Sequence, residues 1–323
     1  MKKFRFAIMG AAKIAHKFCN GVKLLENCEV VAVASKSMER AQEFAEKNNL
    51  PAAYDSYEEM LIKEKPDCVY IAVTVNDHFR LCMLCLDYNV PVICEKAMFM
   101  NSSEAEIVFK RSQEQRVFVM EATWSRFLPA VRQAKAWIQQ GEIGQVRFLD
   151  ASIGFVAPTG DDNRYHSPSL GGGAARDITI YTYEIARMMV DKPFGETQIQ
   201  AVWGKTGVDL TEHISIQCED VLVSLVTSFA AKLEEIMVIY GEKGKVVIPR
   251  PHVASQAMLY DEKGELAEHF KDEVTQNGFI YEIAECVECI RSGKIESEVV
   301  PQALTLDCAK LFDMIDKTKE GMD

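Results

Sequence analysis

The chain has 323 residues, 48% of them hydrophobic, which is enough for a large core and, by length, for two domains. Its 48 acidic residues against 36 basic ones give a net charge of -12, which argues against a nucleic-acid surface or a basic membrane contact. No apolar run reaches the roughly 18 residues that span a bilayer. We therefore expect a cytoplasmic protein whose partner is a small molecule, with no nucleic-acid or membrane partner.

Strands alternate with helices over the first 120 residues. Apolar runs that predict strands are separated by amphipathic segments that predict helices, and this alternation is typical of a doubly wound parallel sheet, the Rossmann arrangement. The predicted strands are residues 4–9, 29–34, 67–73, the apolar part of 89–97, and 117–120.

The turn after the first strand has the place, but not the full pattern, of a dinucleotide-binding loop. A G-x-G-x-x-G sequence between a strand and a helix binds a pyrophosphate at the helix N-terminus. Here only Gly10 is a glycine, and Ala12 and Ala15 occupy the other two positions. We assign cofactor binding to the five residues that open this turn, Gly10, Ala11, Ala12, Lys13 and Ile14.

The second strand ends without the acid that an NAD-selective site uses to bind the ribose 2′-hydroxyl. Ser35 and Lys36 stand there, with Arg40 one helical turn later. Because these side chains can bind a 2′-phosphate, they favour NADP, with NAD as the alternative cofactor. Ser37 has a second interpretation, as the cap of the helix over residues 38–47.

Polar residues also follow the third strand. Asp77 can cap the helix that follows, and His78 then lies in its first turn at the ligand-binding edge of the sheet. His78 is either a cofactor or substrate contact or an ordinary histidine at a helix start. We assign cofactor binding to the residues around this strand end, Thr74, Val75, Asn76 and His78.

The next strand ends abruptly in Glu95 and Lys96. Ligands bind at the carboxyl ends of parallel strands, so a lysine there is a candidate catalytic group, with Glu95 beside the cofactor. The alternative is an ordinary surface pair of an acid and a lysine that closes a strand.

The pattern changes after residue 121. A long alternating strand over residues 145–155 and a polar loop over 158–169 precede three consecutive glycines, which permit a close backbone approach. In the helix that follows, Asp177 and Tyr181 are spaced i and i+4 and share a face. Further alternating strands predict a mostly antiparallel sheet, closed by helices over 279–291 and 303–319. We expect a dinucleotide-binding domain over residues 1–122 and a substrate-binding and dimerisation domain over 123–323.

The ten cysteines are scattered, and most lie in apolar runs, as reduced core thiols do. Two pairs, Cys82 with Cys85 and Cys286 with Cys289, have the C-x-x-C spacing of zinc and redox sites. Both lie inside predicted helices without turn glycines. We expect no metal site.

Taken together, five motifs make the whole chain resemble the Gfo/Idh/MocA oxidoreductases, the glucose-fructose oxidoreductase-like enzymes, and among them the trans-1,2-dihydrobenzene-1,2-diol dehydrogenase-like branch. Their order and spacing fit the family. The motifs are residues 8–15, Cys94-Glu95-Lys96, and residues 120–127, 171–177 and 240–244. The resemblance implies a Rossmann domain followed by an α/β domain with a large open sheet that pairs subunits into a homodimer or higher homo-oligomer.

The resemblance also implies roles for individual residues. Lys96 matches the catalytic lysine of a Glu-Lys-Pro motif, Asp177 the acid after the glycines, and Tyr181 a position held by histidine or tyrosine. Arg176 replaces an apolar residue, and it either contacts an anionic substrate or forms an ion pair. The positions that line the substrate pocket in the branch are His78, Trp124, Phe155 and Phe279, of which the apolar ones have a core role as the alternative.

Two other departures from the family bear on the site. Ala97 replaces the proline of the motif, which removes the residue best able to hold a cis or kinked bond beside Lys96. Pro251 and His252 stand where the diol branch carries an aromatic pair, and this weakens the expectation of an aromatic diol.

We therefore predict an NADP(H)-dependent dehydrogenase that moves a hydride between nicotinamide and a hydroxyl or carbonyl of a polyol, sugar or vicinal diol. Tyr181 exchanges the proton, assisted by Lys96 and oriented by Asp177. In the alternative arrangement Lys96 is the acid/base and Tyr181 only binds. The competing functions are a reductase of keto-sugars, phosphorylated or not, and a nucleotide-sensing regulator without turnover.

Overall fold

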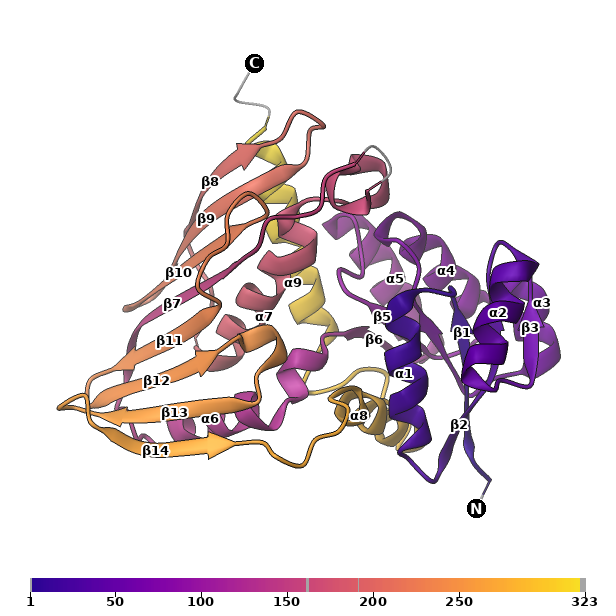
Figure 1. Ribbon diagram of the computed structural model, residues 1–323, viewed down its shortest axis with the longest axis horizontal. Helices are drawn as coiled ribbons and strands as arrows, with labels where there is room; N and C mark the ends of the chain where they lie inside the picture. The colour runs from indigo at the N-terminus through magenta and orange to yellow at the C-terminus, as the bar shows by residue number, and fades with distance from the viewer. Residues whose placement is uncertain (1, 161–162, 191, 320–323) are drawn as a thin grey trace. The chain divides into compact units, whose positions relative to one another are not determined.

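In the computed structural model, which describes residues 2–160, 163–190 and 192–319, the first part of the chain forms a six-stranded parallel sheet (Figure 1). The strand order is β3-β2-β1-β4-β5-β6, and every adjacent pair is parallel. The order reverses direction between β1 and β4, so the carboxyl ends of these two strands flank the switch point at which such sheets bind ligands. The strands are β1 Phe4–Met9, β2 Cys28–Ala34, β3 Ala52–Tyr54, β4 Cys68–Ile71, β5 Val92–Glu95 and β6 Val119–Ala122.

The helices of this sheet differ in how they begin. Ser37, Ser56 and Asn101 cap α2, α3 and α5 by accepting a hydrogen bond from a first-turn backbone N–H. The caps of α1 and α4 are Ala12 and Thr74, and neither makes a side-chain cap bond. The two helices whose first N–H groups have no side-chain cap therefore follow β1 and β4, at the switch point. The helices are α1 Lys13–Lys23, α2 Met38–Asn48, α3 Tyr57–Glu64, α4 Val75–Asp87 and α5 Ser102–Gln115.

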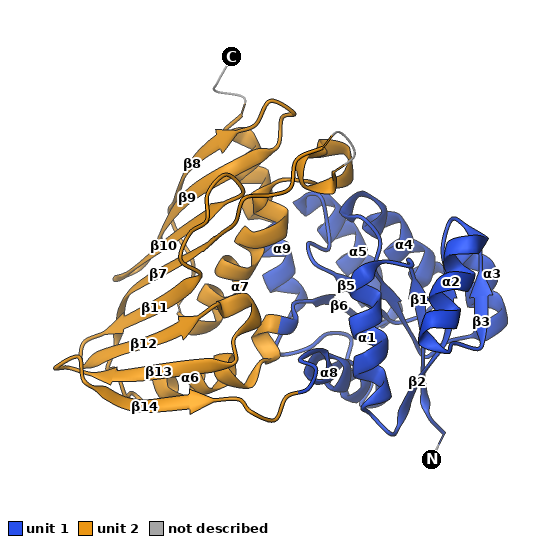
Figure 2. Ribbon diagram, in the orientation of Figure 1, with its two compact units in different colours: residues 1–124, 276–309 blue, residues 125–275, 310–323 orange. Residues whose placement is uncertain are grey.

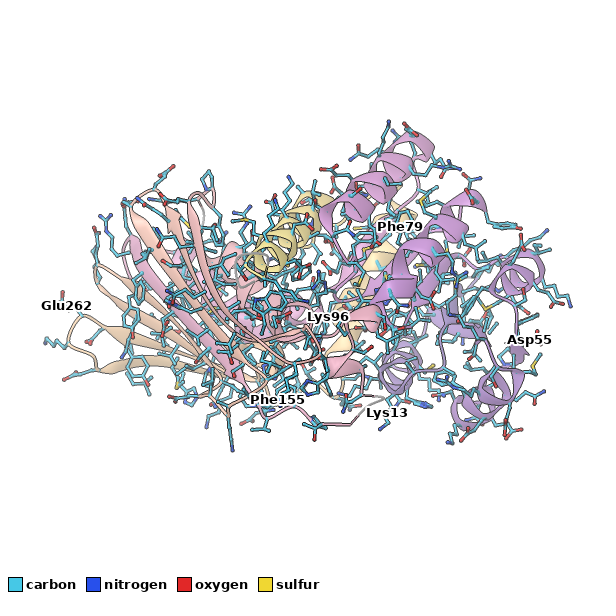
Figure 3. All side chains as sticks on the ribbon, turned by 90° about the horizontal axis from the view of Figure 1, so that it is seen from above. Lys13, Asp55, Phe79, Lys96, Phe155 and Glu262 are labelled. Atoms are coloured by element: carbon cyan, nitrogen blue, oxygen red, sulfur yellow. The ribbon has the colours of Figure 1, made fainter. Side chains whose placement is uncertain are left out.

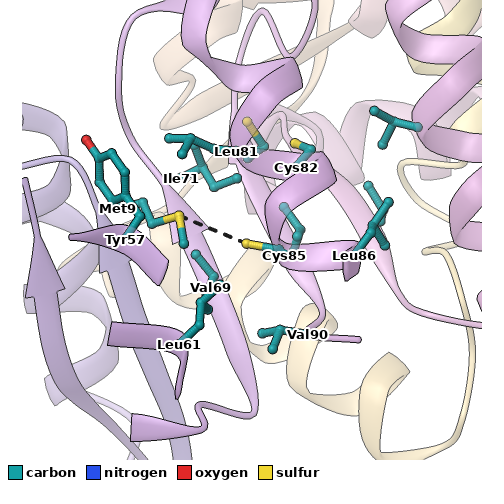
Figure 4. Packing of buried hydrophobic residues seen from close by; sticks show 14 of the residues in the cluster. Met9, Tyr57, Leu61, Val69, Ile71, Leu81, Cys82, Cys85, Leu86 and Val90 are labelled. Carbon is teal, nitrogen blue, oxygen red and sulfur yellow. Dashed lines mark hydrogen bonds between the residues drawn. The ribbon is translucent and has the colours of Figure 1, made fainter. Parts of the chain in front are cut away.

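The strands of this sheet are buried because helices cover both faces. Met9, Val69 and Ile71 pack against Leu81 and Leu86 of α4 in one apolar cluster (Figure 4). The thiol of Cys85 lies 4.0 Å from the sulfur of Met9 in the same cluster. Burial from both sides explains why these strands read as continuous apolar runs.

The second sheet has eight strands in the order β14-β13-β12-β11-β7-β10-β9-β8. All adjacent pairs are antiparallel except β7 with β10. Helices α6 Pro129–Gln139 and α7 Ile180–Met189 pack on this sheet, α6 against β12 to β14 and α7 against β7 and β10. The strands are β7 Val146–Gly154, β8 Thr197–Trp203, β9 Asp209–Cys218, β10 Val221–Ser228, β11 Ile236–Gly241, β12 Gly244–Pro249, β13 Gln256–Asp261 and β14 Leu266–Lys271. The predicted fold class is confirmed.

The chain divides into two compact units (Figure 2). Unit 1 is Met1–Trp124 with Gln276–Ala309, and unit 2 is Ser125–Thr275 with Lys310–Asp323. Unit 1 therefore contains α8, Phe279–Arg291, which packs on α1, and the start of α9, Gln302–Lys317. This differs from the predicted division at residues 122 and 123, because an apolar helix pattern does not say which sheet it covers. No described helix is long and apolar enough to cross a membrane.

Candidate active site

The turn after β1 fits a dinucleotide pyrophosphate. Gly10 has a φ of +108°, and a Cβ there would lie 2.2 Å from the carbonyl oxygen of Ala72, so only glycine fits. Its N–H donates to the carbonyl oxygen of Ala34 at 2.8 Å. Ala12 then starts α1 without a side-chain cap, and the first turn of that helix carries no acid. Backbone N–H groups at the start of α1 are thus available to an anion.

Charged side chains gather near the ends of β2 and β4. Lys36 Nζ lies 2.6 Å from Asp77 Oδ2, and Arg80 Nε lies 3.5 Å from Asp77 Oδ1. The Arg80 guanidinium is also 5.9 Å from the ring centre of Tyr57. Burial raises the pKa of Tyr57, and the charges of Lys36, Asp77, Arg80 and Arg40 all act on its hydroxyl. The cluster contains three cations and one acid.

Two of these residues were not assigned to the cofactor from sequence. Asp77 does not cap α4, whose cap is Thr74; it lies in the first turn and pairs with Lys36. Arg80 follows one turn later. The pairing depends on the sheet order that places β2 and β4 on either side of β1, and no local pattern encodes it. Ser37 caps α2, which confirms the second interpretation given to it.

His78 is buried, with both ring nitrogens facing backbone carbonyl oxygens. Nδ1 lies 3.0 Å from the carbonyl oxygen of Ala97, and Nε2 lies 3.2 Å from that of Val73. Burial lowers the pKa of His78, so the ring is neutral at pH 7 and donates to one of these oxygens at a time. In this position His78 connects the first turn of α4 to the segment after Lys96.

Lys96 follows the last residue of β5 (Figure 3). Beside it, the buried Glu95 accepts a hydrogen bond from the hydroxyl of Tyr70. Burial raises the pKa of Glu95, against the opposing effects of the Tyr70 hydrogen bond and the charge of Lys96. The Lys96–Ala97 peptide bond is cis although the proline of the motif is absent.

The backbone that follows Lys96 is held by two buried side chains. His78 faces the carbonyl oxygen of Ala97, and Glu121 Oε1 accepts a hydrogen bond from the N–H of Met98 at 2.8 Å. Glu121 comes from the neighbouring strand β6 and is 2% exposed. The position of Lys96 therefore rests on contacts to the two residues that follow it, one from α4 and one from β6.

Asp177 and Tyr181 lie where the glycine run of unit 2 enters α7. Ala175–Thr179 form one π-helical turn that contains Asp177, and Tyr181 follows in the first turn of α7. Arg164 Nη1 lies 3.4 Å from Asp177 Oδ1, and the Tyr181 ring lies 5.7 Å from the ring of His252. Arg164 comes from the predicted polar loop, of which residues 161 and 162 lie outside the described residues. In the sequence, Arg164 is only one charged residue in a polar loop, and nothing there indicated that it pairs with Asp177.

A buried acidic network lies behind this π-helical turn. Asp209 Oδ2 accepts from the N–H of Ala175 at 2.6 Å, and Glu212 Oε2 accepts from Thr179 Oγ1 at 2.6 Å and from Thr227. Burial, followed by the hydrogen bond to Asp209, raises the pKa of Glu212 well above its usual value. The raised pKa favours the protonated, uncharged form of the Glu212 carboxyl beside the acid Asp209.

The predicted substrate residues fall into both units. In unit 1 the rings of Trp124 and Phe279 stack with centres 5.2 Å apart. In unit 2 Phe155 packs against Phe229 at 5.2 Å. Arg176, 7% exposed, places Nη2 2.5 Å from Asp316 Oδ2, so of its two predicted alternatives the ion pair is formed. Lys96 thus lies in unit 1, and Asp177 and Tyr181 lie in unit 2.

The cysteine pairs are buried thiols. Burial raises the pKa of Cys85 and of Cys286 well above the usual value, which disfavours the thiolate that binds metals. Within the described ranges, no group of three or more histidine, cysteine, aspartate or glutamate side chains is placed to hold a metal ion.

Comparison with known proteins places these features in a family. Residues 4–123 match the oxidoreductase family with an NAD-binding Rossmann fold, and residues 131–247 match the GFO/IDH/MocA C-terminal domain. The trans-1,2-dihydrobenzene-1,2-diol dehydrogenase of Danio rerio is 32% identical over 326 residues, which cover 98% of this chain and 96% of that protein.

Two solved structures share the fold over nearly the whole chain. A 3-ketoreductase from Actinomadura kijaniata, in complex with NADP and TDP-benzene, has a TM-score of 0.86 and 21% identity, with 98% of both chains covered. A levoglucosan dehydrogenase, in complex with NADH and levoglucosan, has a TM-score of 0.89 and 16% identity, with 100% of this chain and 98% of that chain covered. The two family models and the Danio rerio relative show that this chain belongs to the Gfo/Idh/MocA family of oxidoreductases.

Proposed function

We propose that this oxidoreductase uses NADP(H) to transfer a hydride between nicotinamide and a hydroxyl or carbonyl of a sugar-like molecule or vicinal diol. The observation that carries the proposal is Lys96 at the carboxyl end of β5, with its neighbouring backbone held by His78 and Glu121. The relative from Danio rerio is a diol dehydrogenase, and the structural neighbours are a ketoreductase and a sugar dehydrogenase. All three names describe the oxidation of an alcohol or the reverse reaction, the reduction of a ketone.

Unit 1 binds the cofactor in this proposal. The N-terminus of α1 receives the pyrophosphate, and the cations near the end of β2 receive the 2′-phosphate. Lys36, Arg40 and Arg80 outnumber the one acid of their cluster, Asp77, and this excess of positive charge favours NADP over NAD.

The bound nicotinamide supplies the hydride chemistry, and the side chains handle one proton. Tyr181 exchanges that proton with the substrate oxygen, and the positive charge of Lys96 stabilises the oxygen that has lost it. Asp177, held by Arg164, orients these groups from one turn before Tyr181. In the alternative arrangement Lys96 exchanges the proton and Tyr181 binds the substrate.

The test measures binding and turnover separately. Nicotinamide fluorescence gives the affinities for NADPH and NADH, and absorbance at 340 nm gives turnover over a panel of polyols, sugars and keto-sugars. We expect Lys96→Ala to lower kcat about 10³-fold and to leave NADPH binding within a few-fold of the wild type. Tyr181→Phe distinguishes the two arrangements, because it abolishes turnover only if the phenol exchanges the proton.

Three outcomes would contradict parts of the proposal. Absence of binding to either nucleotide rejects the cofactor. Binding without turnover on the whole panel favours either the nucleotide-sensing regulator or a substrate outside the panel. Turnover that persists in Lys96→Ala would show that Lys96 is not a catalytic residue.

We further propose that the second sheet mediates homodimerisation. Leu222, Phe148 and Tyr240 are cross-strand neighbours on β10, β7 and β11, and Leu222 and Tyr240 are exposed. An exposed apolar row of this kind is typical of a protein interface. Light scattering after size exclusion is expected to give twice the chain mass for the wild type and the monomer mass for Leu222→Lys/Tyr240→Lys.

A further inference from the structure

Asp77 occupies a position that the proposed function does not explain. It is an acid in the cluster to which a 2′-phosphate is assigned, and such a position ordinarily favours cations. Its carboxylate lies between two of them, 2.6 Å from Lys36 Nζ and 3.5 Å from Arg80 Nε. The side chain of Asp77 is 19% exposed and that of Lys36 is 67% exposed, so the acid is the fixed member of the pair.

The electrostatic environment keeps Asp77 ionised. Burial raises its pKa, but the hydrogen bond and charge of Lys36, together with Arg80, outweigh burial and leave the pKa below its usual value. A full negative charge therefore stands beside Lys36 throughout the physiological pH range.

An ionised acid in this place acts differently on the two nucleotides. A 2′-phosphate that binds Lys36 must compete with Asp77 for the ammonium group, and it also meets the negative charge of the carboxylate. A ribose 2′-hydroxyl carries no charge, so it meets neither penalty, and it can donate a hydrogen bond to the carboxylate. The same side chain thus weakens NADPH binding and is neutral or favourable for NADH.

We infer that Asp77 sets the nucleotide preference of this enzyme by holding Lys36 in competition with the 2′-phosphate. The inference rests on the proposed assignment of the cofactor to unit 1. It makes the preference a balance between residues 41 positions apart, Lys36 on one side and Asp77 on the other.

The experiment compares the ratio of the Kd for NADH to the Kd for NADPH in four proteins, by nicotinamide fluorescence titration at low salt. They are the wild type, Asp77→Asn, Lys36→Gln and the double variant. Asp77→Asn keeps the shape and removes the charge. We expect it to raise the ratio about five-fold, because in a water-like dielectric a charge about 6 Å away changes the affinity for one unit of opposing charge about three-fold and for the doubly charged phosphate about ten-fold. Because Asp77 acts through Lys36, the same substitution is expected to change the ratio less in the Lys36→Gln background.

A matched control removes an equivalent charge elsewhere. Glu104 is an acid in the first turn of α5, as Asp77 is in α4, and it accepts a hydrogen bond from the N–H of Met100. Glu104→Gln therefore reproduces any loss of helix-dipole stabilisation, and it is expected to leave the ratio of the two affinities unchanged. If Asp77→Asn folds poorly, Asp77→Ser gives the same test with a residue that is tolerated at helix starts.

Each outcome has one meaning. An unchanged ratio in Asp77→Asn, or a shift towards NADH, overturns the inference and leaves the proposed function intact. An equal effect of Asp77→Asn with and without Lys36 shows direct repulsion and overturns the role of the ion pair. If the wild type binds neither nucleotide, the proposed function and this inference both fail.

Discussion

Each unit buries a pair of acids next to a segment that carries a predicted catalytic residue, and the two pairs are satisfied differently. In unit 2, Asp209 accepts a hydrogen bond from the backbone of residue 175, and Glu212 accepts hydrogen bonds from two threonines. In unit 1, Glu95 accepts from Tyr70, whereas neither carboxyl oxygen of Glu282 has a hydrogen-bond partner among the described residues.

The buried acids therefore differ in what they do. Those of unit 2 hold other groups through hydrogen bonds, whereas Glu282 and Glu95 interact through their charges. Burial raises the pKa of both Glu212 and Glu282, but the second cause is a hydrogen bond to Asp209 in one case and repulsion by Glu95 in the other. The acids of unit 2 hold the π-helical turn that contains Asp177. The Glu282 carboxyl makes no hydrogen bond to any other described residue, so its burial is an energetic cost to unit 1.

The largest expected effect comes from disturbing the unit 2 pair sterically. A Cβ on Gly173 would lie 2.2 Å from Asp209 Oδ1, and the φ of Gly173 is +115°. We expect Gly173→Ala to lower the free energy of unfolding by about 3 kcal/mol or more, because both the strained backbone and the displaced carboxylate contribute. Urea unfolding measures this change.

Gly264→Ala is the matched control in the same unit. Gly264 has a φ of +79°, and a Cβ there meets nothing within 4 Å. It should therefore show only the backbone contribution, about 1 kcal/mol. Equal losses in the two variants would show that the Asp209 carboxylate moves aside freely and does not hold the turn.

The second prediction concerns pH. The pKa of Glu212 is raised on folding from 4.5, so the folded state binds the proton more tightly than the unfolded chain does. The contribution of Glu212 to the free energy of unfolding is therefore fully present below about pH 4.5. It falls as pH rises towards the folded pKa, by up to about 1.4 kcal/mol per pH unit. Unfolding in urea at pH 5, 6 and 7 measures the slope.

Glu212→Gln tests the origin of that slope. The amide can donate to Asp209 and accept from Thr179 and Thr227, and it does not titrate. We expect a shallower dependence on pH in this variant, with little loss of stability at pH 5. An unchanged slope would assign the titration to other groups, since the pKa values of Glu95 and Glu282 are also raised.

The parts of this structure that sequence could predict are those set by local pattern. The buried strand that ends at Glu95 and Lys96, and the glycine run before Asp177, are local, and the structure places both at the ends of secondary-structure elements. Strands β3, β13 and β14 were not predicted. Of these, β14 is an edge strand whose side chains are mostly exposed, so it shows no alternation of apolar and polar residues.

The contacts that support the site are instead tertiary contacts between segments that are distant in sequence. Asp209 meets the N–H of Ala175 across 34 residues, and Lys36 meets Asp77 across 41. From the sequence, no role was predicted for Asp209, and Asp77 was predicted as a helix cap. Only the folded structure shows which group each carboxylate faces. The residues that position the site were therefore harder to predict than the residues that they position.

The smallest expected effect comes from removing Glu282, whose carboxyl has no hydrogen-bond partner in the part of the chain that the structure describes. Glu282→Met keeps the volume of the side chain and removes a buried polar group, so we expect the free energy of unfolding to be unchanged or to rise by about 1 kcal/mol. The paired variant Glu95→Met removes the acceptor of the Tyr70 hydroxyl in the same unit, and leaving that buried hydroxyl without an acceptor should cost about 2 kcal/mol. If urea unfolding shows that the free energy of unfolding falls in Glu95→Met and does not fall in Glu282→Met, then Glu95 stabilises the fold and Glu282 does not. A loss of stability in Glu282→Met equal to that in Glu95→Met would mean that Glu282 also stabilises the fold, and the contrast between the two units would not hold.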